Sequence, residues 1–179
     1  MKAVTAYLGL GGNLGDPEEA IRKALALLEA DGSVKIIGVS SFYRTEPVGM
    51  ARIEGQAIPW FVNAVAKICT PLSPEKLLER CLSIEQQLGR DRSHNPAYTG
   101  ALSRTLDVDI LFYGDSIVHM PGLTIPHPRV QERVFTLVPL RELAPDLMHP
   151  ELGMTIDALA RNLDNQTGLE LLEPLSTVH

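Results

Sequence analysis

The sequence predicts an α+β fold with a ferredoxin-like β-α-β-β-α-β core, in which helices cover a mainly antiparallel sheet, followed by a C-terminal hairpin and helices. Three observations predict it. Strand-like runs alternate with two segments of helical periodicity, both helices begin at a capping residue followed by proline, and glycines end several elements. A chain of 179 residues that is 45% hydrophobic can bury a core without disulfides or a metal. We therefore expect a single domain over residues 1–163 and a polar C-terminal tail over 164–179.

The two helices of the core have clear beginnings. Asp16 and Ser73 are each followed by a proline and by acidic residues, which is typical of a helix N-terminus. In chain order we expect a strand over 3–10, a helix from 17 to about 31, strands over 34–43 and 60–69, a helix from 74 to about 88, and a strand over 105–113.

The segments outside this core are less regular. Residues 44–59 and 90–103 contain no clear periodicity, and long loops of this kind are often functional. Beyond the core we expect a short hairpin after residue 114, a helix from about Arg129, and a last helix over 155–162.

The overall charge excludes some classes of partner. With 16 Lys and Arg against 22 Asp and Glu, the net charge is -6, which argues against binding to nucleic acid or to an anionic membrane. No apolar run approaches the roughly 18 residues of a membrane span. The two cysteines have no pattern of a disulfide framework or a zinc site. We expect a cytoplasmic enzyme without an obligate protein partner.

Asp107 and Asp109 are the sharpest chemical feature. They lie two residues apart in the fourth expected strand, so both side chains should share one face while Leu106, Val108 and Ile110 occupy the other. Two carboxylates on one face suit Mg²⁺, which takes one or two carboxylates together with substrate phosphates. Two solvated aspartates on an exposed sheet face are the alternative interpretation.

Arginines surround the two aspartates. Residues 90–133 contain no lysine, and their five arginines balance five acidic residues. One guanidinium group can bind two phosphate oxygens at once, and arginines near a carboxylate–metal site are typical of phosphoryl transfer. A surface ion pair is the alternative for each of them, and especially for Arg129. The five are Arg90, Arg92, Arg104, Arg129 and Arg133.

Three further features say less when each is taken alone. His127 is flanked by prolines that fix its direction, although a single histidine is more often structural than catalytic. Phe61 and Asn63 share one strand face and could bind a flat ring, or could be a core aromatic beside a loop-bonding amide. The glycine cluster over 9–15 lacks the spacing of nucleotide-binding loops, which favours a sharp turn and close packing instead.

Taken in order, six motifs between Tyr7 and about Leu143 carry a family resemblance. Each motif is weak alone, but six in this order are specific, and together they resemble the 6-hydroxymethyl-7,8-dihydropterin pyrophosphokinases of folate biosynthesis. The motifs are Leu10 to Asp16, Ser41 to Gly49, Phe61 to Ala64, Leu88 to Arg92, Arg104 to Leu111, and Ile125 to Pro128 followed by Arg133.

The resemblance implies transfer of pyrophosphate from ATP to the hydroxymethyl group of the pterin, giving AMP and the pterin diphosphate. It implies that Asp107 and Asp109 hold two Mg²⁺ ions and act in catalysis with Arg90, Arg92 and Arg104. The implied ATP contacts are Glu85, Arg92, Arg104, His127 and Arg133, and the implied pterin pocket consists of Thr45, Val48, Phe61, Asn63 and Phe135.

One departure from the family pattern concerns the pterin. The family usually has an aromatic residue and a Gly-Pro pair just before the arginine that matches Arg104, where this chain has Ala101, Leu102 and Ser103. Tyr98, in the same loop, is a candidate for the missing ring. Two other functions remain open: a non-catalytic ferredoxin-like binding module for a nucleotide or pterin, and a metal-dependent phosphohydrolase.

Overall fold

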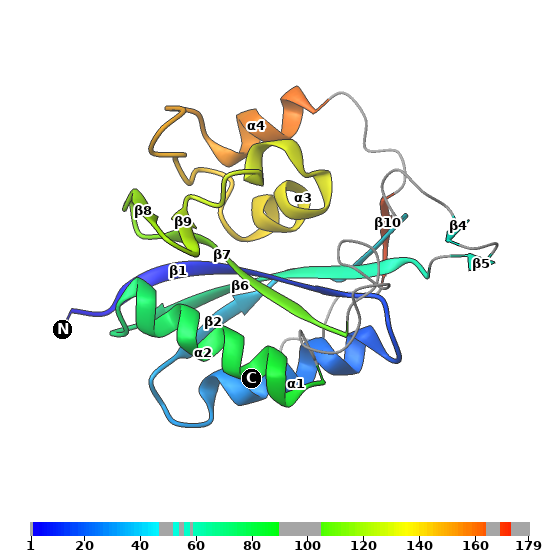
Figure 1. Cartoon of the computed structure of the whole chain (residues 1–179). Helices are drawn as coiled ribbons and strands as arrows, with labels where there is room; N and C mark the ends of the chain where they lie inside the picture. The colour runs from blue at the N-terminus through cyan, green and yellow to red at the C-terminus, as the bar shows by residue number, and fades with distance from the viewer. Residues whose placement is uncertain are drawn as a thin grey trace.

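One antiparallel sheet forms the centre of the molecule (Figure 1). The computed structural model describes residues 2–46, 52–53, 56–57, 59–89, 105–163 and 169–172. The strands lie in the order β10-β3-β6-β1-β7, and β2 also pairs with β6. The core strands are β1 (Val4–Gly12), β2 (Lys35–Val39), β3 (Tyr43–Thr45), β6 (Phe61–Thr70) and β7 (Asp107–Tyr113), with β10 (Leu169–Leu171) at the edge.

The connections between these strands define the fold class. Strand β6 lies between β1 and the β2–β3 pair, and β1 lies between β6 and β7, with antiparallel pairing throughout. Helices α1 (Pro17–Glu29) and α2 (Pro74–Gln87) therefore each cross over one strand. This is the split β-α-β arrangement, and the predicted ferredoxin-like core is confirmed.

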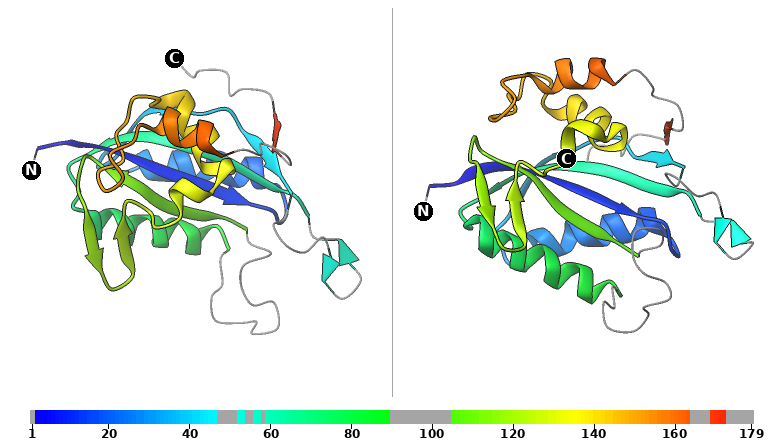
Figure 2. Two further views of the ribbon diagram at one scale, coloured as in Figure 1. Left: turned by 90° about the horizontal axis from the view of Figure 1, so that it is seen from above. Right: turned by 45° about the horizontal axis from the view of Figure 1, so that its top comes forward.

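Two layers of helices enclose the sheet (Figure 2). Helices α1 and α2 cover one face, where Ile21 and Leu77 are fully buried. Helices α3 (Val134–Leu143) and α4 (Ile156–Asn162) cover part of the other face, where Leu137 and Ile156 pack in a second cluster with Phe112. Burying such a side chain contributes about 1.5–3 kcal/mol, so these clusters hold both layers on the sheet.

Side-chain caps set the helix beginnings as expected. The Asp16 carboxylate accepts from the Glu19 backbone N–H at 3.0 Å, and the Ser73 hydroxyl accepts from the Lys76 N–H at 3.4 Å. After α2, Gly89 takes a φ of 94°, a left-handed conformation that ends the helix at little cost for glycine.

The prediction of a single strand over 34–43 is wrong, because the segment is divided between β2 and β3. The division falls at Ser40, whose hydroxyl accepts from the Val65 backbone N–H at 2.9 Å. The Ser40 hydroxyl thereby takes the place of a backbone carbonyl as the acceptor for this N–H of β6. A register shift between Ile36 and Gly38 adds a further irregularity to β2.

Three other segments differ from the expected pattern. The stretch over 44–59 contains a short ladder, β4 (Arg52–Ile53) paired with β5 (Gln56–Ala57). The helix expected from about Arg129 is a 3₁₀ turn, η2 (Val130–Glu132), followed by α3. The tail contributes β10, which pairs with β3. The expected hairpin is present as β8 (Val118–Met120) and β9 (Leu123–Ile125), and Thr155 caps α4.

Both cysteines are free thiols, as expected. Cys81 is buried, and burial raises the pKa of its thiol to about 12, whereas Cys69 is only half-buried. Of the helices in the described part of the chain, none has the length and apolar character needed to cross a bilayer.

A polar contact between α3 and β3 provides a first test of the fold. The Tyr43 hydroxyl donates to one oxygen of the Glu142 carboxylate, and the Ser41 N–H donates to the other at 2.9 Å. Burial and this bond raise the pKa of Tyr43. We expect Tyr43→Phe to lower the free energy of unfolding by about 1–2 kcal/mol, measured by urea denaturation, because the bond to a charged acceptor is lost.

Glu142→Gln tests the acceptor side of the same contact. Its single amide oxygen can accept from Tyr43 or from the Ser41 N–H but not from both, so we expect this variant to lose stability as well. Equal stability of Tyr43→Phe and the wild type would contradict a stabilising role for the contact.

Candidate active site

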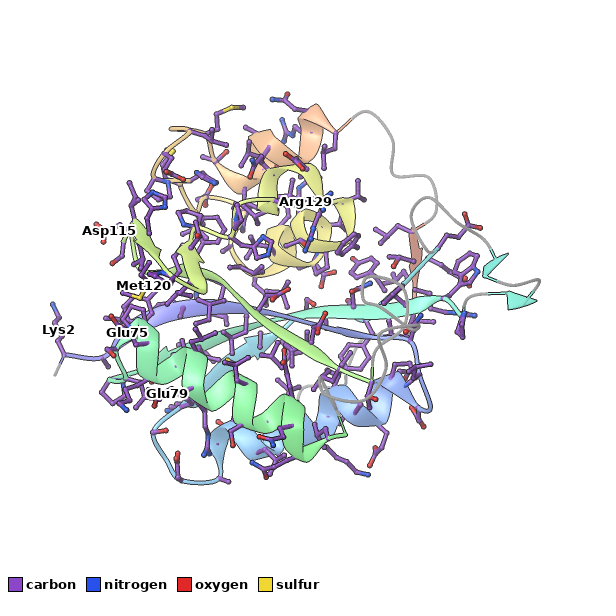
Figure 3. All side chains as sticks on the ribbon, in the orientation of Figure 1. Lys2, Glu75, Glu79, Asp115, Met120 and Arg129 are labelled. Carbon is purple, nitrogen blue, oxygen red and sulfur yellow. The ribbon has the colours of Figure 1, made fainter. Side chains whose placement is uncertain are left out.

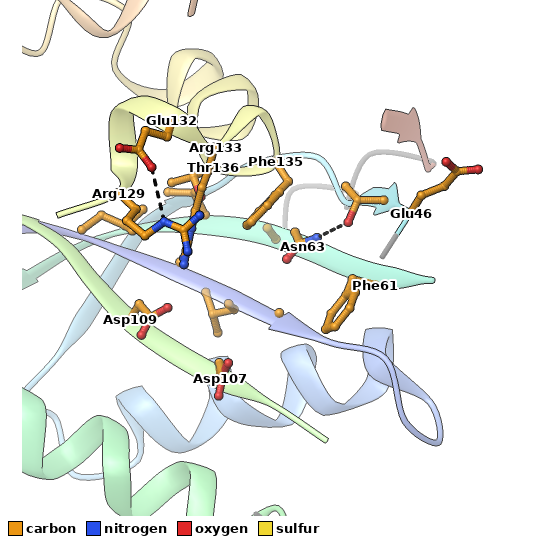
Figure 4. Close-up of a pocket in the computed structure, with 17 residues that line it drawn as sticks. Glu46, Phe61, Asn63, Asp107, Asp109, Arg129, Glu132, Arg133, Phe135 and Thr136 are labelled. Carbon is orange, nitrogen blue, oxygen red and sulfur yellow. Dashed lines mark hydrogen bonds and ion pairs between the residues drawn. The ribbon is translucent and has the colours of Figure 1, made fainter. Parts of the chain in front are cut away.

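A cleft of about 400 Å³ opens between the sheet and the segment that leads into α3 (Figure 4). Its floor is formed by β1, β6, β7 and the end of β3, and its roof by residues 129–136. The lining residues are Gly9, Leu10, Gly11, Thr45, Glu46, Phe61, Asn63, Ala64, Val65, Asp107, Asp109, Leu111, Arg129, Glu132, Arg133, Phe135 and Thr136.

Two glycines of β1 contribute no side chains to the middle of the cleft floor. In the sheet register Gly11 lies between Asn63 and Asp107, and Gly9 lies between Val65 and Asp109. A Cβ atom at Gly11 would stand 2.4 Å from the Asn63 Oδ1, which is closer than real contacts allow. Only glycine therefore lets the Asn63 amide lie across β1.

Asp107 and Asp109 both line the cleft from β7. Leu106, Val108 and Ile110 are at most 4% exposed and belong to the apolar cluster under α1 and α2. The predicted alternation of the two faces is thereby confirmed. Asp107 is buried and Asp109 is half-buried, and both present hard oxygen atoms to the same space.

The edge of β7 is supported from outside the cleft. Glu85 of α2, only 3% exposed, accepts from the Val108 backbone N–H at 2.8 Å. Further along, the His127 backbone N–H donates to the Leu111 carbonyl at 3.0 Å. These bonds satisfy edge groups that would otherwise face solvent, and they hold the strand that carries the two aspartates.

The roof brings positive charge above the aspartates. Arg133 lies over the Phe135 ring at 5.6 Å, and its pKa is lowered by burial and by Arg129, while Asp109 acts in the opposite sense. Arg129 pairs with Glu132 at 3.3 Å. Guanidinium groups near two carboxylates form a site that can bind a metal and an anion together.

His127 precedes the roof segment in the chain and does not line the cleft. Its Nδ1 accepts from the Arg129 N–H at 3.2 Å, so the neutral ring carries its proton on Nε2. Burial lowers the pKa of His127, and Arg133 and Arg129 lower it further, whereas Asp109 raises it. A lowered pKa favours the neutral form of the imidazole.

The other end of the cleft suits a flat polar ring. Phe61 and Asn63 of β6 and Phe135 of α3 line this end (Figure 4). The Asn63 Nδ2 donates to the Thr45 hydroxyl at 2.9 Å, which orients the amide and turns its Oδ1 toward Gly11. This end offers stacking surfaces and a fixed amide oxygen.

Seven of the predicted site residues meet in this one cleft: Thr45, Phe61, Asn63, Asp107, Asp109, Arg133 and Phe135. Glu85 and His127 do not line it. Val48, Arg90, Arg92, Tyr98 and Arg104 lie outside the described residues.

Several lining residues were not predicted from the sequence. Gly9 and Gly11 were interpreted as turn and packing glycines, and the close approach to Asn63 supports the packing, but β1 continues to Gly12 before it turns. Their period-two spacing was the signal that they share the face of the aspartates' cleft. Arg129 has its expected ion pair with Glu132, yet both also line the cleft.

Fold and cleft together define an enzyme class. A sheet that presents carboxylates for a cation, guanidiniums for an anion and a slot for a flat ring is typical of a phosphotransferase acting on an aromatic substrate. Residues 7–145 match the family model described as 7,8-dihydro-6-hydroxymethylpterin-pyrophosphokinase. The chain therefore belongs to this pyrophosphokinase family, and it is an ATP-dependent diphosphotransferase.

Curated relatives support the same family. The chain is 39% identical over 163 residues to a 2-amino-4-hydroxy-6-hydroxymethyldihydropteridine pyrophosphokinase of Haemophilus influenzae, covering 91% of this chain and 96% of the relative. A protein of the same name from Bacillus subtilis is 42% identical over 138 residues, 77% of each chain.

A solved structure supports the fold. The chain superposes on Plasmodium falciparum HPPK-DHPS, crystallised with pterin and p-hydroxybenzoate, with a TM-score of 0.68 and 18% sequence identity. The match covers 90% of this chain and 42% of that longer chain.

The close approach of Gly11 to Asn63 generates a second prediction. We expect Gly11→Ala to lower the free energy of unfolding by about 1–3 kcal/mol, measured by urea denaturation, because the new methyl group displaces the Asn63 amide from Thr45. Gly9→Ala is the matched control: its Cβ meets only the flexible Leu111 side chain, at 3.3 Å, so a smaller loss is expected.

A double-mutant cycle checks the cause of this loss. In an Asn63→Ala background the steric conflict is absent, so Gly11→Ala should cost much less than in the wild type. Equal costs in both backgrounds would show that the conflict with Asn63 is not the reason.

Proposed function

We propose that this cleft is where the chain transfers the β,γ-pyrophosphate of ATP to the hydroxymethyl oxygen of 6-hydroxymethyl-7,8-dihydropterin, giving AMP and the pterin diphosphate. The observation that carries the proposal is the convergence of Asp107, Asp109 and Arg133 with Phe61, Asn63 and Phe135 on one cleft. The family named above performs this reaction in folate biosynthesis. The cytoplasm is the location that the composition favours.

Asp107 and Asp109 are the proposed ligands of Mg²⁺. Their carboxylates are hard donors on a supported strand, and successive positions on one strand face are about 6.6 Å apart. The described lining contains four carboxylates and two guanidiniums, and this net negative charge attracts a cation. The described residues contain no group of three or more His, Cys, Asp or Glu side chains that could hold a metal ion. Held by these two carboxylates, Mg²⁺ would supply positive charge to neutralise the phosphates of a bound triphosphate.

Arg133 is the described residue best placed to bind the triphosphate. It hangs from the roof above the aspartates, half-buried, where a guanidinium forms stronger bonds to phosphate than at an open surface. Arg92 and Arg104 are proposed to contribute from the segment outside the described residues, with Arg90 assisting. His127, through its Nε2 proton, and Glu85 are further proposed ATP contacts.

The pterin is proposed to bind between the two phenylalanine rings. In that position its ring edge faces the Asn63 amide, whose direction Thr45 sets at 2.9 Å. The two glycines of β1 place no side chain of their own between the pterin slot and the aspartates. The hydroxymethyl group can thus approach the β-phosphorus, and holding the reactants in this geometry is the main source of acceleration.

An assay of AMP release tests this function. We expect AMP from ATP only when both Mg²⁺ and 6-hydroxymethyl-7,8-dihydropterin are present, and chelation of the metal with EDTA should abolish it. Asp107→Asn and Asp109→Asn should each lower kcat/KM at least about 100-fold, because each removes a charged metal ligand.

Asp115→Asn is the matched control, because Asp115 is an exposed aspartate at the turn after β7, away from the cleft (Figure 3). It should retain wild-type activity. Phosphate release from ATP without the pterin would indicate a phosphohydrolase instead, and binding without any turnover would indicate a binding module. Normal turnover in both cleft variants would refute the metal role.

A further inference from the structure

Arg129 stands in the cleft although nothing in its local sequence assigns it there. It follows Pro128 and precedes the 3₁₀ turn η2, and its side chain lines the same space as Asp107, Asp109 and Arg133. In Figure 4 it lies in the roof above the two aspartates, next to Arg133. A cation at this position faces the path along which a polyanion would lie.

The partner of Arg129 is weakly held. Its Nε donates to the Glu132 carboxylate at 3.3 Å, and the two side chains are 64% and 58% exposed. Ion pairs exposed to this degree contribute about 0–1 kcal/mol, so a phosphate group with more charge can replace the carboxylate at little cost. Glu132 also lines the cleft, where its negative charge opposes an incoming triphosphate.

The positive charge of Arg129 acts on its neighbours. Burial lowers the pKa of Arg133 and the charge of Arg129 lowers it further, so two guanidiniums lie close together in the roof. Like charges this close repel one another unless an anion lies between them. Such an arrangement is favourable for a ligand that carries several negative charges.

We propose that Arg129 is a further triphosphate-binding residue of this enzyme, and that Glu132 is the counter-ion it exchanges for phosphate when ATP binds. The proposal rests on the proposed function, because it takes the triphosphate to lie between Arg133 and the aspartates. The alternative is that Arg129 and Glu132 form a surface ion pair that takes no part in binding.

The test measures KM for ATP and for the pterin separately, each at saturating concentration of the other substrate. We expect Arg129→Gln to raise KM for ATP about five- to tenfold while KM for the pterin and kcat stay within about twofold. Arg129→Lys should be intermediate, since it keeps the charge but loses the planar fork. The increase should shrink as salt concentration rises.

Arg161→Gln is the matched control. Arg161 is 69% exposed and pairs with Asp157 at 2.8 Å, but it lies on α4 and does not line the cleft. It should leave both KM values unchanged. Glu132→Gln should lower KM for ATP about twofold, because the competing carboxylate is removed.

Each outcome decides the proposal. If Arg129→Gln behaves like Arg161→Gln, or raises both KM values equally, Arg129 does not bind the triphosphate. A rise of KM for ATP in Glu132→Gln would overturn the counter-ion exchange. A wild-type protein that releases no AMP in the presence of the pterin would instead contradict the proposed function, so the two failures are distinguishable.

Discussion

The absence of side chains at two cleft-facing positions of β1 is the constraint on which the cleft depends. Gly9 and Gly11 line the cleft between the residues of β6 and those of β7. A methyl group at Gly11 would overlap the Asn63 amide. The two halves of the site, an amide with aromatic rings and a pair of carboxylates, therefore lie on either side of a strand that places no side chain of its own between them.

A second constraint is the rigidity of β7, which lies at the edge of the sheet. Edge strands carry unpaired backbone groups, and here Glu85 and the His127 backbone take up two of them. Because both faces of β7 are packed or enclosed, its alternation divides cleanly into an apolar row and a row that carries Asp107 and Asp109. Carboxylates on such a strand need little reorganisation when a ligand binds.

Features that are caused by neighbours within a few residues could be predicted correctly from the sequence. The Asp16 and Ser73 caps, the Gly89 stop and the alternation around Asp107 depend on neighbours within a few residues, and each was predicted correctly. The interruption at Ser40 was missed because it depends on the Val65 amide, 25 residues away. Strand β10 was missed for the same reason, since only its pairing with β3 makes it a strand.

The family, the fold class and the chemically distinctive residues of the cleft, such as Asn63, Asp107 and Asp109, can be predicted from the sequence, because motif order and side-chain periodicity are properties of the chain. Contacts between segments that are far apart in the chain cannot be predicted in this way. The neighbours of Glu85, the ring direction of His127 and the presence of Arg129 in the cleft follow from how α2 and the roof pack on the sheet. Arg129 and Glu132 have the spacing of a surface ion pair, and only the position of the 3₁₀ turn above the aspartates brings that pair into the cleft.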